Sequence, residues 1–421
     1  MVQVIAAELV WTGDRFERGV HVTVDNGRIT AVGTPARPAT LRLPKRALLP
    51  GFVNAHSHAF QRGLRGHVEA FPDGAGSFWA WREAMYGLAA DLSWKGFREQ
   101  CANAFTEMRA AGITTVGEFH YFHHAKADDY ALDTVVLDAA REAGIRIVLL
   151  NAYYATGGIG EPLQGAQLRF KTESTKAYLK QMDALQNSLD PATQSLGFVV
   201  HSVRASNKRD LGEIHRESKR RGSVFHIHME NQLLEVQQCM EAYGKRPLQV
   251  LLECAEVDDK TTCVHCIHSD PSDMMMYRTS GGRVCLCPLT EANLGDGLID
   301  IANVGAVSLG TDSNARISML EEMRWLEYGQ RLRMRRRGLH EDAGAMLAAA
   351  TVGGAISLGV DTGEIAPDRL ADFAVIDLEA PALRGWTEAT LLPAIVTGTG
   401  EEVIAGTCVG GDWAWRDGAG P

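Results

Sequence analysis

The chain has 421 residues, of which 45% are hydrophobic and 22% charged, so it is long enough for one large core and a smaller second domain. Its formal net charge of −10 and pI near 5.8 argue against a general binder of nucleic acids or anionic membranes. Because no apolar run suits a membrane span and no basic-then-apolar leader is present, we expect a cytoplasmic protein.

The eight cysteines are too few for the disulfide framework of a small secreted domain, so we expect reduced thiols. Cys263 with Cys266, and Cys285 with Cys287, have the spacing of thiolate zinc ligands. Both pairs lie in or beside apolar, strand-like runs, where cysteine commonly serves as a small buried hydrophobe. The one basic run, Arg331 to Arg337, indicates a solvated helix face rather than a nucleic-acid patch.

Both ends of the chain are rich in predicted strands. The N-terminal strands are expected at 2–6, 20–24 and 28–32, with a turn at Asp25-Asn26-Gly27. The C-terminal strands are expected at 373–377, 394–396 and 402–407. We expect the two sets to pair into one small β-sandwich domain formed by residues 1–49 and 361–421.

Between the two ends, strands alternate with helix-like segments such as 97–111 and 131–143. The predicted strands are 47–53, 114–119, 145–151, 197–201, 224–228, 262–265, 284–288 and 306–310. Eight such units predict an α/β fold, a closed (β/α)₈ TIM-like barrel over residues 50–360. In that fold, chemistry is expected at the carboxyl ends of the strands.

Two histidines at the end of the first barrel strand point to a metal site. His56 and His58 are two residues apart, and such residues project from the same side of an extended strand. Imidazole nitrogen suits a borderline divalent ion such as Zn²⁺. A lone His-x-His would more often be structural, but this one has further candidates downstream.

Polar side chains follow the other predicted strands in order. They are Glu118 to Tyr121, His201, His226 to His228, His265, and Thr311 to Ser313. One such residue is readily explained as a hydrogen-bonded histidine or a helix-capping aspartate. Together they supply several neutral nitrogen donors and one carboxylate, which leaves a coordination position open for water.

Several stretches carry a family resemblance. Gly363-Glu364-Ile365 and the run 371–377 are similar to the C-terminal signature of the amidohydrolase superfamily, in whose single-metal branch the histidine pattern also fits. More narrowly, the chain resembles the formimidoylglutamate deiminase family. The matching stretches are 54–62 (NAHSHAFQR), 78–86 (FWAWREAMY), 117–124 (GEFHYFHH), 201–204 (HSVR), 287–297 (CPLTEANLGDG) and 324–331 (RWLEYGQR).

The resemblance implies a role for individual residues. The metal ligands, for one divalent ion expected to be Zn²⁺, would be His56, His58, His228 and Asp312. His265 would orient the attacking water, and Asp312 would also take its proton. The substrate-binding residues would be Gln61, Arg82, Tyr121, His201 and Arg204. The implied reaction is amidine hydrolysis with release of ammonia from an acyclic dicarboxylic substrate, whose two carboxylates suit two guanidinium groups.

Arg82 follows a glycine-rich loop at 73–76, so we expect a mobile segment to carry it over the mouth of the barrel. The alternative is a surface arginine stacked on Trp79 or Trp81.

The chain departs from the family at the catalytic acid. The family pattern after the third histidine ligand is His-x-x-Glu, whereas here Asn231 occupies the acid's position and Glu230 precedes it. An amide cannot shuttle a proton at neutral pH. Either Glu230 reaches the site through a bulge or an altered strand end, or the reaction no longer needs that acid. A one-residue offset turns a side chain away unless the backbone changes, which favours altered chemistry.

Three functions therefore stay open. The first is formimidoylglutamate deimination. The second is a diverged amidohydrolase acting on another amidine, guanidine or cyclic C–N compound, in a biosynthetic pathway for example. The third is a non-catalytic relative that binds a small dicarboxylate, against which the retained ligand set and His265 argue. In each case we expect a small-molecule partner with two anionic groups, no nucleic-acid or membrane partner, and a homodimer.

Overall fold

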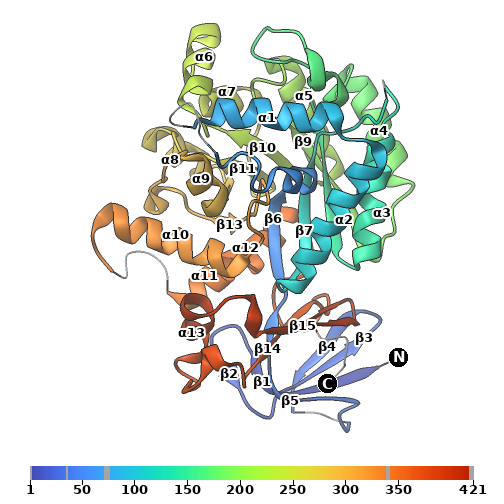
Figure 1. Ribbon diagram of the computed structural model, residues 1–421, viewed down its shortest axis with the longest axis vertical. Coiled ribbons are helices and arrows are strands. Elements are labelled where there is room, and N and C mark those ends of the chain that lie inside the picture. Colours follow the sequence, from blue (N-terminus) through green and yellow to red (C-terminus); the bar gives the residue numbers. More distant parts are fainter. Residues whose placement is uncertain (1, 35–36, 71–75, 127, 338–341, 417–421) are drawn as a thin grey trace.

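An eight-stranded parallel barrel forms the larger part of the molecule, and a sheet from both termini lies beneath it (Figure 1). The structure, a computed structural model, describes residues 2–34, 37–70, 76–126, 128–337 and 342–416. The barrel strands, each paired with the next, are β6 (Phe52–Ser57), β7 (Ile113–His120), β8 (Arg146–Tyr153), β9 (Gln194–Val200), β10 (Phe225–Met229), β11 (Thr261–His265), β12 (Arg283–Leu286) and β13 (Val307–Leu309). The predicted (β/α)₈ class is confirmed.

The first predicted strand, 47–53, is in fact parts of two strands that belong to different sheets. β5 (Leu41–Pro50) pairs in the terminal sheet, and β6 begins at Phe52 in the barrel. The break falls at Gly51, whose N–H donates to the Asp372 carbonyl, whereas the Phe52 N–H donates to Gly112. The apolar pattern runs across this break because both strands are buried, so the sequence alone does not reveal it.

Helices alternate with the barrel strands and cover the barrel. They are α1 (Phe78–Asp91), α2 (Trp94–Ala110), α3 (Ala131–Ala143), α4 (Thr175–Gln186), α5 (Lys208–Arg221), α6 (Leu233–Tyr243), α7 (Pro247–Cys254), α8 (Pro271–Thr279), α9 (Pro288–Leu294), α10 (Met319–Met334), α11 (Ala343–Ala349) and α12 (Val352–Leu358). Short 3₁₀ turns η1 (Ala59–Leu64) and η2 (Gly165–Phe170) follow β6 and β8. Helix α1 lies across the end of the barrel that is remote from the terminal sheet (Figure 1).

The two termini share one mixed sheet of eight strands. Its order is β16 (Asp412–Trp415), β15 (Ile404–Val409), β14 (Phe373–Asp377), β5, β1 (Gln3–Trp11), β3 (His21–Asp25) and β4 (Arg28–Gly33), and β2 (Phe16–Glu17) pairs with β1. The predicted pairing of strands from both ends is confirmed. The predicted strand at 394–396 is wrong, because these residues lie in α13 (Leu391–Gly398), where Ile395 and Val396 are buried.

A buried ion pair joins the barrel to this sheet. The Arg146 guanidinium, at the start of β8, donates to both carboxylate oxygens of Asp372 over 2.9 and 3.0 Å. Asp372 also accepts hydrogen bonds from the Thr362 hydroxyl and the Gly410 N–H. Because every polar group around it has a partner, this junction fixes the barrel on the sheet.

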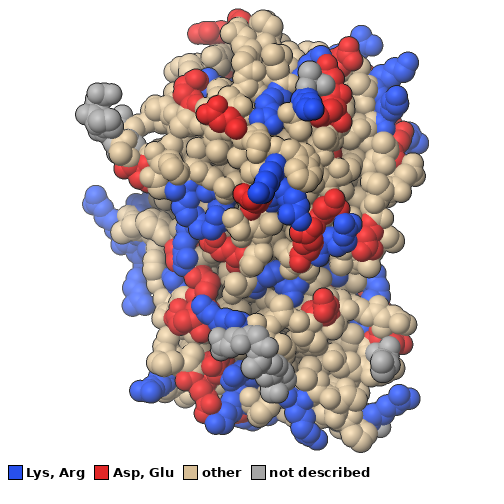
Figure 2. Space-filling model, turned by 45° about the vertical axis from the view of Figure 1, so that its right-hand side comes forward, with Lys and Arg blue, Asp and Glu red and all other residues tan. Residues whose placement is uncertain are grey.

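Charges of both signs cover the surface. Figure 2 shows Lys and Arg intermixed with Asp and Glu over the face that it presents. The basic run 331–337 lies at the exposed end of α10, where Arg331 pairs with Glu327 and Arg333 with Asp300. Among the described helices, none has the length and apolar character that crossing a membrane requires.

Candidate metal centre and substrate cavity

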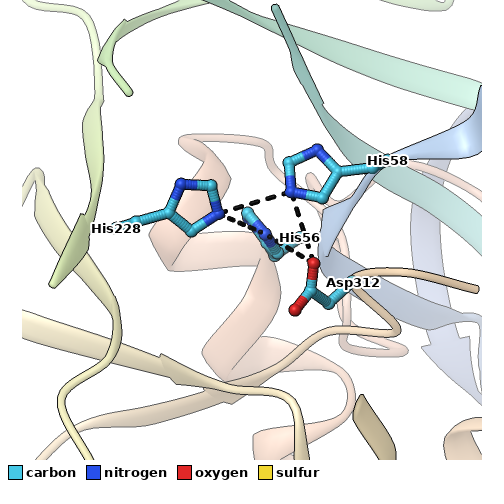
Figure 3. A group of neighbouring side chains, drawn as sticks. All are labelled: His56, His58, His228 and Asp312. Carbon is cyan, nitrogen blue, oxygen red and sulfur yellow. Dashed lines mark hydrogen bonds and ion pairs between the residues drawn. The ribbon is translucent and has the colours of Figure 1, made fainter. Parts of the chain in front are cut away.

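Four ligand-type side chains converge at the carboxyl end of the barrel (Figure 3). His56 is the penultimate residue of β6, His58 follows that strand, and His228 lies in β10. Asp312 follows β13, and its positive φ of 46° turns its side chain toward the histidines. The structure therefore brings together the four residues that the sequence predicted as ligands.

Backbone carbonyls fix the orientation of two of these rings. His58 Nδ1 lies 2.8 Å from the Phe119 carbonyl, and His228 Nδ1 lies 3.0 Å from the His201 carbonyl. A carbonyl oxygen only accepts, so each Nδ1 carries the proton and each Nε2 presents a lone pair. Metal-binding histidines are usually held in this way.

The distances among the four ligand atoms fit a tetrahedral ion. His228 Nε2 lies 3.2 Å from His56 Nε2 and 3.3 Å from His58 Nε2. Asp312 Oδ1 lies 3.3 Å from His58 Nε2 and 3.5 Å from His56 Nε2. Ligands bound about 2.0–2.1 Å from a tetrahedral ion are separated by about 3.3–3.4 Å. The Nε2 lone pairs of His58 and His228 face each other with no proton between them, an arrangement that a cation stabilises.

The protonation states of these groups agree with metal binding. Burial, followed by the charge of His56, lowers the pKa of His58 to about 3, and burial also lowers the pKa of His228. Burial opposes ionisation of Asp312, but the hydrogen bond from His56 and the nearby histidines outweigh it and hold the Asp312 pKa below its usual range. Neutral imidazoles and an ionised carboxylate are the forms that bind a metal ion.

His265 lies beside this group, at the end of β11. Its Nε2 is 3.6 Å from Asp312 Oδ2, and its Nδ1 is 3.1 Å from Glu291 Oε1. Burial lowers the pKa of His265, but the Glu291 hydrogen bond and the charges of Asp312 and Glu291 outweigh it and raise the pKa to about 9. Glu291 thus orients His265 toward Asp312.

The two candidates for proton transfer after His228 point in different directions. Asn231 lines the cavity, as His228 does. Glu230 is fully buried elsewhere: its Oε1 accepts from the Leu248 N–H at 3.2 Å and lies 3.6 Å from Arg246 Nε. The reason is the backbone, because Glu230 has a φ of 49°, which ends the strand. Burial raises the Glu230 pKa to about 7.

A cavity opens above the four candidate metal ligands, and all five predicted substrate-binding residues line it. Its lining comprises Gln61, Phe78, Trp81, Arg82, Met85, Tyr86, Tyr121, Tyr154, Phe170, His201, Arg204, Asn231 and Leu294, with His58, His228, His265 and Asp312 at the base. Gln61 Nε2 donates to the Tyr121 hydroxyl at 2.6 Å. Aromatic walls with a few polar groups are typical of small-molecule sites.

The two arginines of the cavity are held differently. Arg204 Nε donates to Glu235 Oε1 at 3.1 Å, and Glu235 is fully buried behind it. Arg82 lies in α1, with its guanidinium carbon 4.4 Å from the Trp79 ring and 5.4 Å from the Tyr86 ring. Stacking on Trp79 and lining the cavity, which the sequence presented as alternatives, therefore occur together. Of the loop before it, residues 73–75 lie outside the described part of the chain.

Sequence reasoning missed two carboxylates that support the site. Glu291 lies within the stretch 287–297, so its position four residues after Cys287 was a usable signal. Glu235 gave no signal, because it lies among the residues of an ordinary helix, α6. Each acts on a residue that the sequence did predict, His265 and Arg204 respectively.

A second histidine group is explained by hydrogen bonding alone. Asp133 Oδ1 accepts from His120 Nε2 at 3.0 Å and His123 Nδ1 at 2.9 Å, and Oδ2 accepts from Asn151 and Gln181 at 3.1 and 2.9 Å. These are hydrogen-bond lengths, shorter than the separations in the first group. Four donors satisfy the buried carboxylate, and the cluster anchors the end of β7.

Comparisons with known proteins agree with this architecture. The sequence profile of the Amidohydrolase family matches residues 47–414. Formimidoylglutamate deiminase from Pseudomonas aeruginosa is 38% identical over 388 residues, which cover 88% of this chain and 85% of that protein. The crystal structure of an amidohydrolase from Brucella melitensis superposes with a TM-score of 0.88 at 30% identity, covering 98% of this chain and 94% of that one.

A more distant structure has the same fold. An adenosine deaminase from Xanthomonas campestris with bound Zn superposes with a TM-score of 0.82 at 21% identity, covering 98% of this chain and 92% of that one. The family profile spans the barrel and most of the C-terminal strands of the terminal sheet. The chain belongs to the Amidohydrolase family.

Proposed function

We propose that the protein uses one divalent ion, Zn²⁺, to hydrolyse the C–N bond of an amidine in an acyclic substrate with two anionic groups, releasing ammonia. The observation that carries the proposal is that Arg82 and Arg204 line the same cavity as the metal-type ligands. Guanidinium groups bind carboxylates in a bidentate manner. The 38% identity to the deiminase of Pseudomonas aeruginosa supports this substrate class.

The chemistry at the base of the cavity follows from the ligand set. A bound Zn²⁺ ion acts as a Lewis acid and lowers the pKa of water. Asp312 Oδ2 and His265 Nε2 lie 3.6 Å apart, so both can reach one water molecule. His265, held by Glu291, orients that water, while Asp312 accepts its proton and passes it to the departing nitrogen.

The upper part of the cavity would hold the anionic groups. Because Arg204 engages Glu235 through Nε, its terminal nitrogens are the donors left for a carboxylate. The Arg82 Nε is buried and has no hydrogen-bond partner among the described residues, so an anion there would satisfy it. Gln61 and Tyr121 form a hydrogen-bonded pair on the same wall.

A second candidate has one specific observation in its favour. Asn231 lines the cavity where the family pattern has its acid, and Glu230 bonds to the start of α7 instead. An amide supplies hydrogen bonds but no proton. The alternative is therefore a hydrolase of the same class that acts on a different substrate. The leaving group of that substrate would depart without being protonated by an acid at position 231.

The test is ammonia release by the zinc-loaded protein over a panel of amidines and guanidines with one or two carboxylates. Rapid turnover of N-formimidoylglutamate supports deimination of that compound. Turnover of a different dicarboxylate, without turnover of N-formimidoylglutamate, supports the second candidate. Binding of dicarboxylates without any turnover contradicts both and leaves a binding protein.

A further inference from the structure

Helix α1 carries Arg82 but buries few residues of its own. Of its 14 residues, only Met85 and Ala89 are buried. Its N-terminus is capped by the Ser77 hydroxyl, which accepts from the Ala80 N–H at 3.2 Å. Trp81, Ala84, Tyr86 and Leu88 also pack against the core but stay partly exposed, so apolar packing and polar contacts together set where α1 and Arg82 lie.

Two residues of the 3₁₀ turn η2 make hydrogen bonds to α1 and to the residue that follows it. Arg169 Nη1 donates to the carbonyls of Ala89 at 2.5 Å and Leu92 at 2.8 Å, at the C-terminal end of α1. Helix C-terminal carbonyls lack partners within the helix, and a cation there also complements the helix dipole. Arg169 therefore fixes one end of α1.

Gln167 fixes the middle of α1. Its Nε2 donates to the Tyr86 hydroxyl at 3.0 Å and to the Gly157 carbonyl at 3.2 Å. Tyr86 is four residues after Arg82, so the two side chains lie on the same helix face. The Arg82 guanidinium carbon lies 5.4 Å from the centre of the Tyr86 ring. Gln167 thus holds the ring beside which Arg82 lies.

The turn η2 is itself anchored to the barrel rim. Arg169 Nε donates to the His124 carbonyl at 3.0 Å, the His124 N–H donates back to the Arg169 carbonyl at 3.0 Å, and His124 Nε2 donates to the Lys171 carbonyl. Phe170 is fully buried, with its ring centroid 4.9 Å from that of Tyr121. The rim that carries Tyr121 is thereby connected through η2 to the helix that carries Arg82.

We propose that Gln167 and Arg169 are positioning residues, which hold α1 so that Arg82 meets an anionic group of the substrate in a preformed site. The inference rests on the proposed function, because it takes Arg82 as an anion-binding residue. Neither Gln167 nor Arg169 lines the cavity. Their effect on substrate binding would therefore be exerted through Arg82.

The test compares Gln167→Leu and Arg169→Lys with the matched control Gln194→Leu. Gln167 and Gln194 are both 7% exposed. Gln194 bonds Leu137 and Asp190 at the amino end of β9, away from the cavity. Arg169→Lys keeps the charge, but lysine lacks the forked geometry that reaches several carbonyls at once.

The first readout is hydrogen exchange of the peptide spanning 78–91 in the zinc-loaded protein. We expect about tenfold faster exchange in Gln167→Leu and Arg169→Lys, the scale of one lost hydrogen bond, and no change in Gln194→Leu. Equal exchange rates for α1 in the unmodified protein and in all three variants would overturn the positioning role.

The second readout is calorimetric binding of glutarate, an unreactive acyclic dicarboxylate. We expect Gln167→Leu to weaken the Kd by about tenfold. In the Arg82→Met background the same change should have no further effect, because residues that act through one another are not additive. If Gln167→Leu weakens the Kd for glutarate by the same factor with and without Arg82→Met, the two residues act independently and the inference is overturned. Absence of glutarate binding to the unmodified protein overturns both the inference and the substrate class, whereas binding without ammonia release rejects only the proposed reaction.

Discussion

The backbone N–H of His58 donates to the carbonyl of Asp312 at 2.8 Å, so two metal-type ligands meet at the seam where β6 and β13 close the barrel. Two residues earlier in the chain, the His56 carbonyl accepts from the Asp312 N–H at 3.0 Å. The geometry of the metal centre is therefore tied to barrel closure, which makes it rigid.

This relationship leads to a prediction on metal content. The unmodified protein should hold one zinc ion per chain, and His56→Ala/His58→Ala should hold none, because two of four ligands are lost. Elemental analysis after dialysis measures this. The control is His226→Gln, since His226 lies on the same strand as His228 but bonds the Ser357 carbonyl. Two ions per chain, or retention in the double variant, would contradict the assignment.

Arg204 should dominate binding of one anionic group. The variant Arg204→Met/Glu235→Gln removes the guanidinium without leaving the buried carboxylate of Glu235 unpaired. We expect KM for the dicarboxylate substrate to rise about 30-fold or more, since truncation of a desolvated charged pair costs ~2–5 kcal/mol. Steady-state kinetics, with Glu235→Gln alone as control, measures the effect. An unchanged KM would reject the role of Arg204.

Glu230 should contribute to pH-dependent stability rather than to turnover. Its side chain bonds the start of α7, so Glu230→Gln should leave kcat nearly unchanged. A positioned acid would instead lose about 10²-fold or more. Ammonia-release kinetics at equal metal content separates the two outcomes, and loss of turnover would identify Glu230 as the substitute acid.

The stability effect has a defined sign. Burial raises the Glu230 pKa from 4.5 to about 7 in the folded protein. The contribution of Glu230 to the stability of the folded protein should therefore be complete below pH 4.5 and be lost as the pH rises through about 7. Glu230→Gln cannot lose that proton, so it should be more stable by about 1–3 kcal/mol at pH 8 and equal at pH 4.5. Denaturant unfolding of both proteins at both pH values tests this. The same difference in the free energy of unfolding at pH 4.5 and at pH 8 would contradict it.

Asn231 should control whether the protein deiminates formimidoylglutamate. Asn231→Glu places a carboxyl group at a position that lines the cavity. We expect ammonia release from formimidoylglutamate to increase by ~10²-fold, the usual scale for a positioned acid. Asn231→Gln is the control, since it lengthens the side chain without adding an acid. Efficient release by the unmodified protein would defeat this prediction.

The sequence by itself determined the barrel and most of the site residues that the structure brings together. Apolar runs alternating with helix-like segments predicted the eight barrel strands, and polar residues at their ends indicated a metal site. The family resemblance then implied which residues would be the ligands and which would line the cavity. The inference of a metal site succeeds because side-chain direction in a strand depends on local backbone geometry, and parallel strands all end at one rim.

Tertiary structure decided what local pattern does not encode. The φ of 49° at Glu230 directs that side chain to α7 and leaves Asn231 in the cavity. The division of 47–53 at Gly51 depends on partners at Gly112 and Asp372, far along the chain. The support of Arg204 by Glu235 likewise joins two segments through packing. Each depends on groups distant in sequence, whose proximity exists only once the core has formed.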